Sequence, residues 1–455
     1  MPGEKELKEY FELLRIESIG ADPAHLKDCV DCASWLKKWL AGAGFSGELL
    51  YPGSPAAALP PPVLFAERKG DEGAPVILFY GHYDVQPADP VQEWSTPPFE
   101  PTVVEDRVYC RGAQDDKGQF FAFLCGLKDF LADRAGSGRG PVPTFKIVLE
   151  GQEECGSAAL SEIAPQIRRK LAADVLLVCD TGASAGLRPA IIAGLRGVSH
   201  FTVRLSGASR DLHSGEYGGL APNAAQAMAA LLASLHNRDG SVAVFGFRDG
   251  IEPPEHEELR LAGEFAPTDE ELAVDIGCSP CGGQMGKTSV QRVSFEPTIE
   301  INGIHSGYGG PGSKTVIPCE AVAKISVRLV PGQTPRGAFE AVRRHLEDNV
   351  PRGMKLSVEG FTPGASGFRL PLASPLFRLA EDVLKEMDGR GPAFVWDGAS
   401  IPVVSVLREV SGAAPLLVGW GQPEDRIHSP NESYSFRQFD KAREWAVRIL
   451  RALAG

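Results

Sequence analysis

The chain has 455 residues, a formal net charge of −13 at pH 7, and 43% hydrophobic and 23% charged residues. This composition is typical of a globular protein, and the length favours two domains. The negative charge argues against nucleic-acid and anionic-membrane partners, which require a basic protein surface. We find neither a charged-then-apolar leader nor an apolar run long enough to span a membrane, so we expect a cytoplasmic protein.

The first part of the chain alternates helical and strand patterns. A helix is predicted near residues 23–42, and apolar runs at 76–80, 145–149 and 175–179 are typical of buried parallel strands. A second helix is predicted at 117–131, between the first two of these strands. This order predicts an α/β domain with a mostly parallel central sheet, whose ligand site lies beyond the carboxyl ends of the strands.

A different pattern begins near residue 190. It predicts, in order, a strand at 201–205, a helix at 223–236, a long polar stretch to about 300, a strand at 323–330, a helix opened by Thr334 and Pro335, and a strand at 355–359. The first pattern resumes after about 370, with a helix at 375–387 and a strand at 415–418. We therefore predict a discontinuous α/β domain, residues 1–190 and 370–455, interrupted by an inserted α+β domain, residues 191–369.

Nine cysteines in a chain of this length do not indicate a disulfide framework. Two CxxC pairs occur, Cys29/Cys32 in a helical pattern and Cys278/Cys281 in a Gly-rich loop. They lie too far apart in sequence for a zinc ribbon. A metal or redox role is therefore the less favoured interpretation for both pairs.

Histidine and acidic residues follow the predicted buried strands directly. Taken singly, a histidine at a strand end or a pair of acidic residues is more often structural than metal-binding. Their joint placement favours a metal site, since imidazole and carboxylate groups suit zinc and similar ions, and two ions about 3.5–4 Å apart can share a water. The candidate groups are His82, the carboxylate pairs Asp115/Asp116 and Glu153/Glu154, Asp180 and His428.

The segments that carry these residues resemble a known family. GHYDVQP, RGAQDDKG, EGQEECGS, the strand-terminal Asp180 and HSPNE occur in family order over nearly the whole chain. They are similar to motifs of the dinuclear-zinc metallopeptidases, which include carnosine dipeptidase, aminoacylase, acetylornithine deacetylase, succinyl-diaminopimelate desuccinylase and carboxypeptidase G. The resemblance implies two divalent ions per chain, zinc in the first place and manganese or cobalt as alternatives. It assigns one ion to His82 and Asp180 and the other to Glu154 and His428, with Asp115 shared.

The same resemblance implies roles for two further carboxylates. Glu153 would be the general base that takes a proton from water and passes it to the leaving amine. Asp84 would orient the imidazole of His82. The peptide bond between Asp115 and Asp116 is expected to be cis.

In the inserted domain, Asp211–Gly219 resembles the DLHSG segment of the carnosine-dipeptidase branch. The resemblance implies a lid and dimerisation domain, and a homodimer in which His213 and Thr315 reach the active site of the other subunit. From the residues alone, a Gly-rich turn with an exposed histidine is the favoured interpretation of this segment. Arg328 would bind the terminal carboxylate of the substrate, or else be a strand residue that faces water. Gly398 and Ser400 would line the pocket near that carboxylate.

Two departures from the branch concern the substrate. The stretch around Ser374 lacks a histidine that the branch places there, which argues against carnosine itself, and His305 is most simply an exposed loop residue. We predict metal-dependent hydrolysis of dipeptides or short peptides. The alternative is an N-acyl amino acid deacylase that uses the same site, and a non-catalytic metal-binding paralogue is less favoured.

Overall fold

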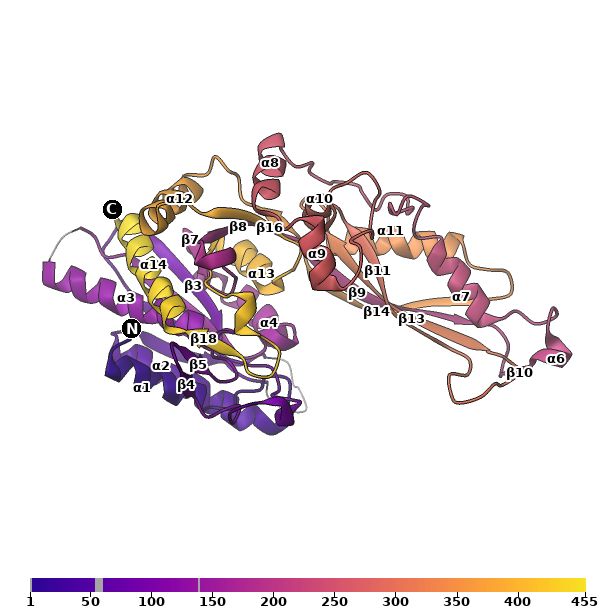
Figure 1. Cartoon of the computed structure of the whole chain (residues 1–455), viewed down its shortest axis with the longest axis horizontal. Helices are drawn as coiled ribbons and strands as arrows, with labels where there is room; N and C mark the ends of the chain where they lie inside the picture. Colours follow the sequence, from indigo (N-terminus) through magenta and orange to yellow (C-terminus); the bar gives the residue numbers. More distant parts are fainter. Residues whose placement is uncertain (1, 54–59, 138–139) are drawn as a thin grey trace. The chain divides into compact units, whose positions relative to one another are not determined.

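A computed structural model describes residues 2–53, 60–137 and 140–455. Its described residues form two compact units (Figure 1). Unit 1 comprises Met1–Ala193, Leu370–Val395 and Val403–Gly455, and unit 2 comprises Gly194–Arg369 and Trp396–Pro402. None of the described helices has the length and apolar character needed to cross a bilayer.

Unit 1 is built on a mixed sheet with a parallel centre, which confirms the predicted fold class. The strands lie in the order β1 (Ser46–Leu50), β2 (Val63–Arg68), β6 (Thr144–Glu150), β3 (Val76–His82), β7 (Val175–Val178), β17 (Ala414–Leu417) and β8 (Ala190–Leu195). The neighbours β6 and β3, β3 and β7, and β7 and β17 are parallel. The flanking strands are antiparallel, and β16 (Ala393–Asp397) pairs with β8.

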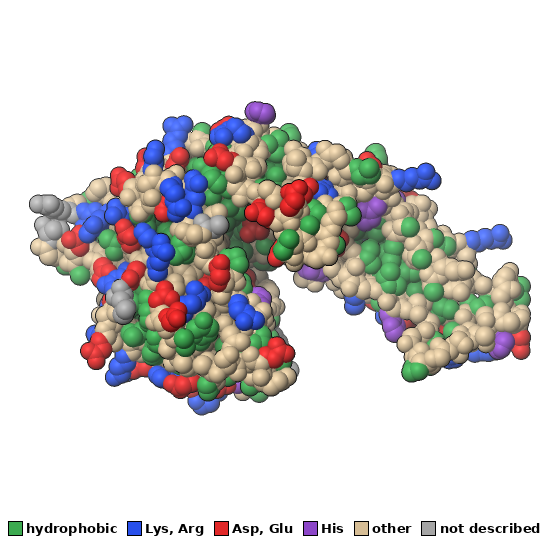
Figure 2. All heavy atoms as spheres, viewed as in Figure 1, with side chains coloured by type: hydrophobic (Ala, Val, Ile, Leu, Met, Phe, Trp, Pro, Cys, Tyr) green, Lys and Arg blue, Asp and Glu red, His purple; other side chains and the backbone are tan. Residues whose placement is uncertain are grey.

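Helices cover this sheet. They are α1 (Glu4–Leu14), α2 (Leu26–Gly42), α3 (Lys117–Ser137), α4 (Ala158–Gln166), α5 (Arg168–Leu171), α12 (Pro375–Asp388), α13 (Pro402–Ser411) and α14 (Phe436–Ala454). α3 packs on β3 and along α14. The run Phe120–Leu124 in α3 is buried at every position, as expected for a helix enclosed on all sides. α14 begins at a capping box in which Ser435 accepts from the backbone of Gln438. On the face that Figure 2 presents, acidic and basic side chains of unit 1 are interspersed.

A small sheet brings the late part of the chain to the loop before α3. Its strands are β4 (Thr102–Val104), β5 (Arg107–Tyr109) and β18 (Ser433–Ser435). β18 pairs with β5 in antiparallel register, with Ser433 opposite Tyr109. This pairing carries the segment that contains His428 back to the loop that contains Asp115.

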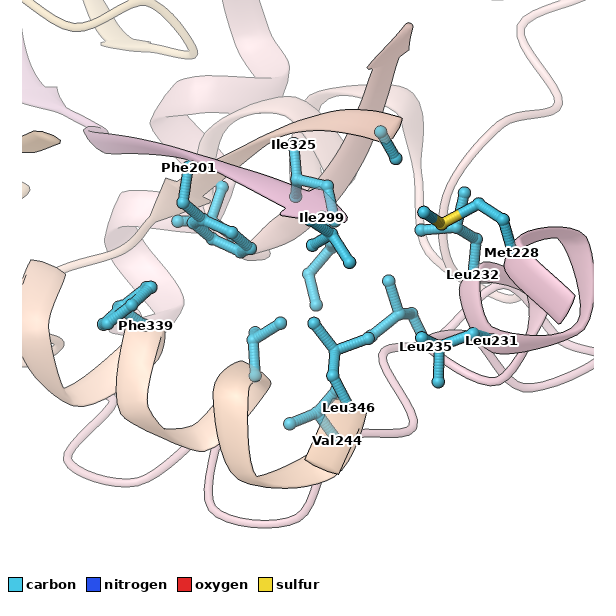
Figure 3. Packing of buried hydrophobic residues seen from close by; sticks show 14 of the residues in the cluster. Phe201, Met228, Leu231, Leu232, Leu235, Val244, Ile299, Ile325, Phe339 and Leu346 are labelled. Carbon is cyan, nitrogen blue, oxygen red and sulfur yellow. The ribbon is translucent and has the colours of Figure 1, made fainter. Parts of the chain in front are cut away.

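Unit 2 is an antiparallel sheet with two helices on one face. The strand order is β11 (Thr298–Ser306), β13 (Glu320–Leu329), β9 (Gly197–Ser206) and β14 (Lys355–Ala365). Figure 3 shows Ile299, Ile325 and Phe201 from the sheet packing with side chains of α7 (Ala224–Ala233) and α11 (Pro335–Asp348). Because strand side chains alternate, the residues between these core positions, Arg328 among them, lie on the opposite face.

The long polar stretch before residue 300, for which no helix was predicted, is partly helical. It contains α8 (His256–Phe265), α9 (Asp269–Ile276), α10 (Ser289–Ser294) and the start of β11. Each helix begins at a capping box, so short-range hydrogen bonds rather than an apolar stripe define it. The remaining elements of unit 2 are β10 (Leu212–His213), α6 (Ser214–Tyr217), β12 (Val316–Ile317) and β15 (Phe368–Arg369). In unit 1, short 3₁₀ turns lie at 23–25, 91–93, 153–155, 185–187 and 423–425.

Candidate metal centre

The parallel strands of unit 1 bring their carboxyl ends to one edge of the sheet. β3 ends on His82, which lies opposite Glu150, the last residue of β6. In β7, Val178 lies opposite Tyr80, and Asp180 follows two residues later. The strand ends therefore carry a histidine and carboxylates to the same place.

Five side chains form two groups there that share one residue. His82, Asp115 and Asp180 each offer an atom within 4.8 Å of the others, and so do Asp115, Glu154 and His428. The shared carboxylate directs one oxygen to each histidine: Oδ1 of Asp115 lies 3.1 Å from Nε2 of His82, and Oδ2 lies 2.9 Å from Nε2 of His428. Nε2 of His428 also lies 3.2 Å from Oε2 of Glu154, and Nε2 of His82 lies 3.7 Å from Oδ2 of Asp180.

The charge balance of this cluster fits divalent cations. Burial and the neighbouring Asp115 and Glu154 carboxylates raise the pKa of Asp180 to about 7, against the opposing effect of the two imidazoles. Burial likewise raises the pKa of Glu153 to about 8. Hydrogen bonds that the His428 ring donates to the Asp115 and Glu154 carboxylates raise the pKa of His428 to about 10. Ions held by these groups would displace the ring protons and offset the repulsion between the carboxylates, as mixed imidazole and carboxylate sites do.

Asp84 connects the His82 ring to the turn that carries Glu153 and Glu154. Its two carboxylate oxygens accept the backbone N–H groups of Glu153 and Glu154 at 3.2 and 3.1 Å. Oδ1 of Asp84 also lies 3.3 Å from Nδ1 of His82, and the backbone oxygen of Asp84 lies 3.1 Å from the same nitrogen. A ring that donates from Nδ1 presents Nε2 as the free ligand atom.

Glu432 anchors the loop that carries Asp115, a role that the sequence analysis missed. Its side chain is fully buried. Oε1 accepts from the backbone N–H groups of Gln114 and Asp115 at 2.9 and 3.1 Å, and Oε2 accepts from Gly112 N and Arg111 Nη1, both at 2.9 Å. The peptide bond between Asp115 and Asp116 is cis, as the family resemblance implied.

Two more side chains contact the cluster without having been predicted. Gln86 donates from Nε2 to Oε2 of Glu154 at 2.7 Å. Asp116 accepts from the backbone N–H of His82 at 3.2 Å, and it is fully buried. Both belong to the quoted motifs, but only the fold reveals their partners.

The other predicted site residues lie in unit 2. His213, at the end of β10, is exposed, and its Nδ1 accepts from Gly215 N at 3.0 Å. Its Nε2 lies 3.4 Å from Oγ1 of Thr315. Arg328 donates from Nη1 to Oγ of Ser400 at 3.0 Å.

Gly398 lies in a position where a side chain does not fit. A Cβ there would meet Cγ1 of Val293 at 2.4 Å and the Val293 backbone oxygen at 3.0 Å. Glycine therefore lets the segment with Ser400 approach α10 closely.

The CxxC pairs and His305 lie outside the two metal-ligand groups of the described residues. Cys29 and Cys32 are fully buried in α2, and burial raises the pKa of the Cys29 thiol to about 12, which suppresses the reactive thiolate. Cys278 and Cys281 are exposed in the loop after α9. His305 is exposed on β11.

Comparison with known proteins places this geometry in a family. The profile of peptidase family M20/M25/M40 matches residues 78–452. The Homo sapiens protein "Beta-Ala-His dipeptidase" is 31% identical over 376 residues, which cover 82% of this chain and 73% of the relative. The Schizosaccharomyces pombe protein "Cys-Gly metallodipeptidase dug1" is 28% identical over 390 residues, covering 84% of this chain and 80% of the relative.

Solved structures agree with these sequence relatives. A crystal structure of an M20 family metallo-carboxypeptidase from Sulfolobus solfataricus superposes with a TM-score of 0.85 at 27% identity, covering 99% of this chain and 100% of the other. Human carnosine dipeptidase 1 superposes with a TM-score of 0.75 at 27% identity, covering 99% and 97% of the two chains.

Proposed function

Because this chain belongs to peptidase family M20/M25/M40, we propose that it is a dinuclear metal-dependent dipeptidase. The observation that carries the proposal is the pair of ligand groups joined through Asp115. The relatives named as β-Ala-His and Cys-Gly dipeptidases support dipeptides as the substrate class. We further propose that the protein acts in the cytoplasm.

His82 and Asp180 would hold one ion, Glu154 and His428 the other, and Asp115 both. The ligand chemistry suits zinc, and also manganese or cobalt. Bound divalent ions supply Lewis acidity, which polarises a carbonyl and makes water more acidic.

Glu153 would act as the general base. Its backbone N–H donates to the carboxylate of Asp84, which fixes the turn that carries Glu153 and the neighbouring ligand Glu154. Burial raises the pKa of the Glu153 carboxyl group, and cations bound beside it would favour its ionised form, in which it can accept a proton from water and return it to the leaving amine. In this role Asp84 both holds that turn and orients the imidazole of His82.

Residues of unit 2 would select the substrate. Arg328 and Ser400, already in contact, offer donors for the terminal carboxylate, with Gly398 beside them. We propose that the working form is a homodimer in which His213 and Thr315 serve the partner's site, where His213 would stabilise the developing oxyanion. A mixture of His213→Ala and Glu153→Gln proteins tests this, because only an exchanged histidine gives one working site per mixed dimer.

The proposal is tested with a panel of dipeptides and N-acyl amino acids, each assayed with zinc, manganese and cobalt. We expect hydrolysis of dipeptides that is abolished by chelators and restored by metal. Glu153→Gln should lower kcat by at least about 100-fold, as expected for loss of a general base. The matched control, Glu93→Gln, changes an exposed glutamate and should retain full turnover. Cleavage of N-acyl amino acids alone would assign the deacylase alternative, and near-normal turnover of Glu153→Gln would refute the base assignment.

A further inference from the structure

Two arginines of unit 2 hold the short segment that contains Gly398 and Ser400. Arg196 donates from its backbone N–H to the oxygen of Ala399 at 3.2 Å and from Nε to the oxygen of Gly398 at 2.9 Å. Arg328 donates from Nη1 to Oγ of Ser400 at 3.0 Å. The two arginines therefore hold three consecutive residues, and their guanidinium groups contact the first and the last of these.

The sheet places Arg328 on its open face, and Arg196 lies directly before the neighbouring strand. Arg328 on β13 lies opposite Val198 on β9, which begins at Gly197, the residue after Arg196. The other side of this sheet carries the hydrophobic core with α7 and α11, so Arg328 faces away from that core. The contacts of Arg196 with Gly398 and Ala399 bring it to the same segment that Arg328 contacts.

Neither guanidinium has an acidic partner within ion-pair distance among the described residues. The side-chain acceptors of Arg196 are the backbone oxygens of Gly398 and, at 3.4 Å, Glu296, and the acceptor of Arg328 is a hydroxyl. Burial, and after it repulsion from the Arg328 charge, lower the pKa of Arg196 to about 10, whereas Glu300 and Asp397 act in the opposite direction. A bound anion would offset this repulsion.

Arg196 also keeps donors for a ligand. Its Nη2 forms no hydrogen bond with the described residues, and a Cβ at position 398 would lie 3.1 Å from this atom. Gly398 has no side chain to cover it. A carboxylate accepts such paired guanidinium donors more strongly than a neutral amide does.

We propose that Arg196 is a second carboxylate-binding arginine, which acts with Arg328 to select substrates that end in a free carboxylate over those that end in an amide. This inference deepens the proposed function and rests on it for the identity of the substrate. It applies equally to dipeptides and to N-acyl amino acids, since both end in a carboxylate.

The test measures binding rather than turnover, in metal-loaded protein that carries Glu153→Gln so that ligands stay intact. Isothermal titration calorimetry gives the Kd of alanylglycine and of its C-terminal amide. In this background, Arg196→Gln should weaken binding of the free dipeptide by about 10- to 100-fold, the range expected for a charged hydrogen bond, and leave binding of the amide about unchanged. Arg196→Lys should restore part of the preference, because it keeps the charge and loses the fork.

The matched control is Arg204→Gln, on strand β9, which begins directly after Arg196. Arg204 is half-buried and pairs with Glu320 and Glu359 away from the segment 398–400, so its loss should change neither Kd. Equal weakening of both ligands by Arg196→Gln, or no weakening, overturns the inference and leaves Arg196 as a support for the segment. If Arg196→Gln does not fold, Arg196→Lys provides the test. The inference is overturned if the ratio of the Kd of the amide to the Kd of the free dipeptide is the same in Arg196→Lys as in the protein that keeps Arg196.

A failure of the proposed function gives a different result. The protein could bind N-acetylglycine more tightly than N-acetylglycine amide and yet fail to bind alanylglycine. The dipeptidase proposal would then be wrong, and the Arg196 variants would be compared on N-acetylglycine and its amide instead. If it binds none of the four ligands, both proposals are refuted.

Discussion

Replacing Glu432 with glutamine should destabilise unit 1 and weaken metal binding together. The carboxylate of Glu432 accepts four hydrogen bonds, two at each oxygen. Whichever oxygen becomes an amide nitrogen, two buried donors then face a donor. Each buried group left unsatisfied costs about 1–3 kcal/mol, so the change should cost about 2–6 kcal/mol. The buried Arg111 also loses its counter-charge, which favours the upper half of that range.

Urea denaturation of the metal-free protein measures the loss of stability, and competition with a chelator measures metal affinity. Metal affinity should fall because Oε1 of Glu432 holds the backbone N–H of Asp115, the shared ligand. The matched control is Glu424→Gln, an exposed glutamate in the 3₁₀ turn before His428. A Glu432→Gln protein with an unchanged unfolding midpoint and unchanged metal affinity would refute the anchoring role.

Three further changes probe other parts of the account. Asp84→Asn should lower metal affinity by about 10- to 100-fold, because Asp84 fixes the turn at 153–154 as well as a ligand ring; unchanged affinity in chelator competition would contradict this. Gly398→Ala should raise KM for dipeptides more than it lowers kcat, because the new Cβ collides with Val293; steady-state kinetics that match the unsubstituted protein would show that the segment shifts freely. Burial raises the pKa of Glu150 to about 7, so between about pH 4.5 and 7 the unfolded chain ionises this group while the folded, metal-free chain does not. Stability should therefore fall by about 3 kcal/mol over this window relative to Glu150→Gln, and parallel pH profiles of the two proteins in urea denaturation would contradict the shift.

The catalytic fold and the clustering of the candidate ligands were accessible from the sequence for a physical reason. The apolar runs of β3, β6 and β7 end directly at polar residues, and parallel strands end at one edge. His82, Glu150 and Asp180 therefore had to come near one another once the sheet was predicted. The antiparallel flanking strands were not predicted, because their apolar patterns are short and depend on pairing with the centre.

What the sequence did not reveal depends on long-range pairing or on local hydrogen bonds. Glu432 acquires its role only through Arg111, 321 residues earlier, by way of the pairing of β18 with β5. No sequence pattern marks Arg196, because its partner Gly398 lies 202 residues away in sequence and is brought to it only by the fold. The helices α8 to α10 were missed because apolar periodicity was used as the signal, although capping boxes such as Thr268 with Glu271 mark their starts.

The central claim, that two ions joined through Asp115 hydrolyse dipeptides, is tested most directly by metal titration. Metal-free protein is loaded stepwise with zinc, manganese or cobalt, and both bound metal and dipeptide hydrolysis are measured at each step. We expect binding that saturates at two ions per chain, dipeptide hydrolysis that rises with that loading, and loss of both in Asp115→Ala. Saturation below one ion per chain, or an absence of dipeptide hydrolysis at full loading with every metal, would contradict it.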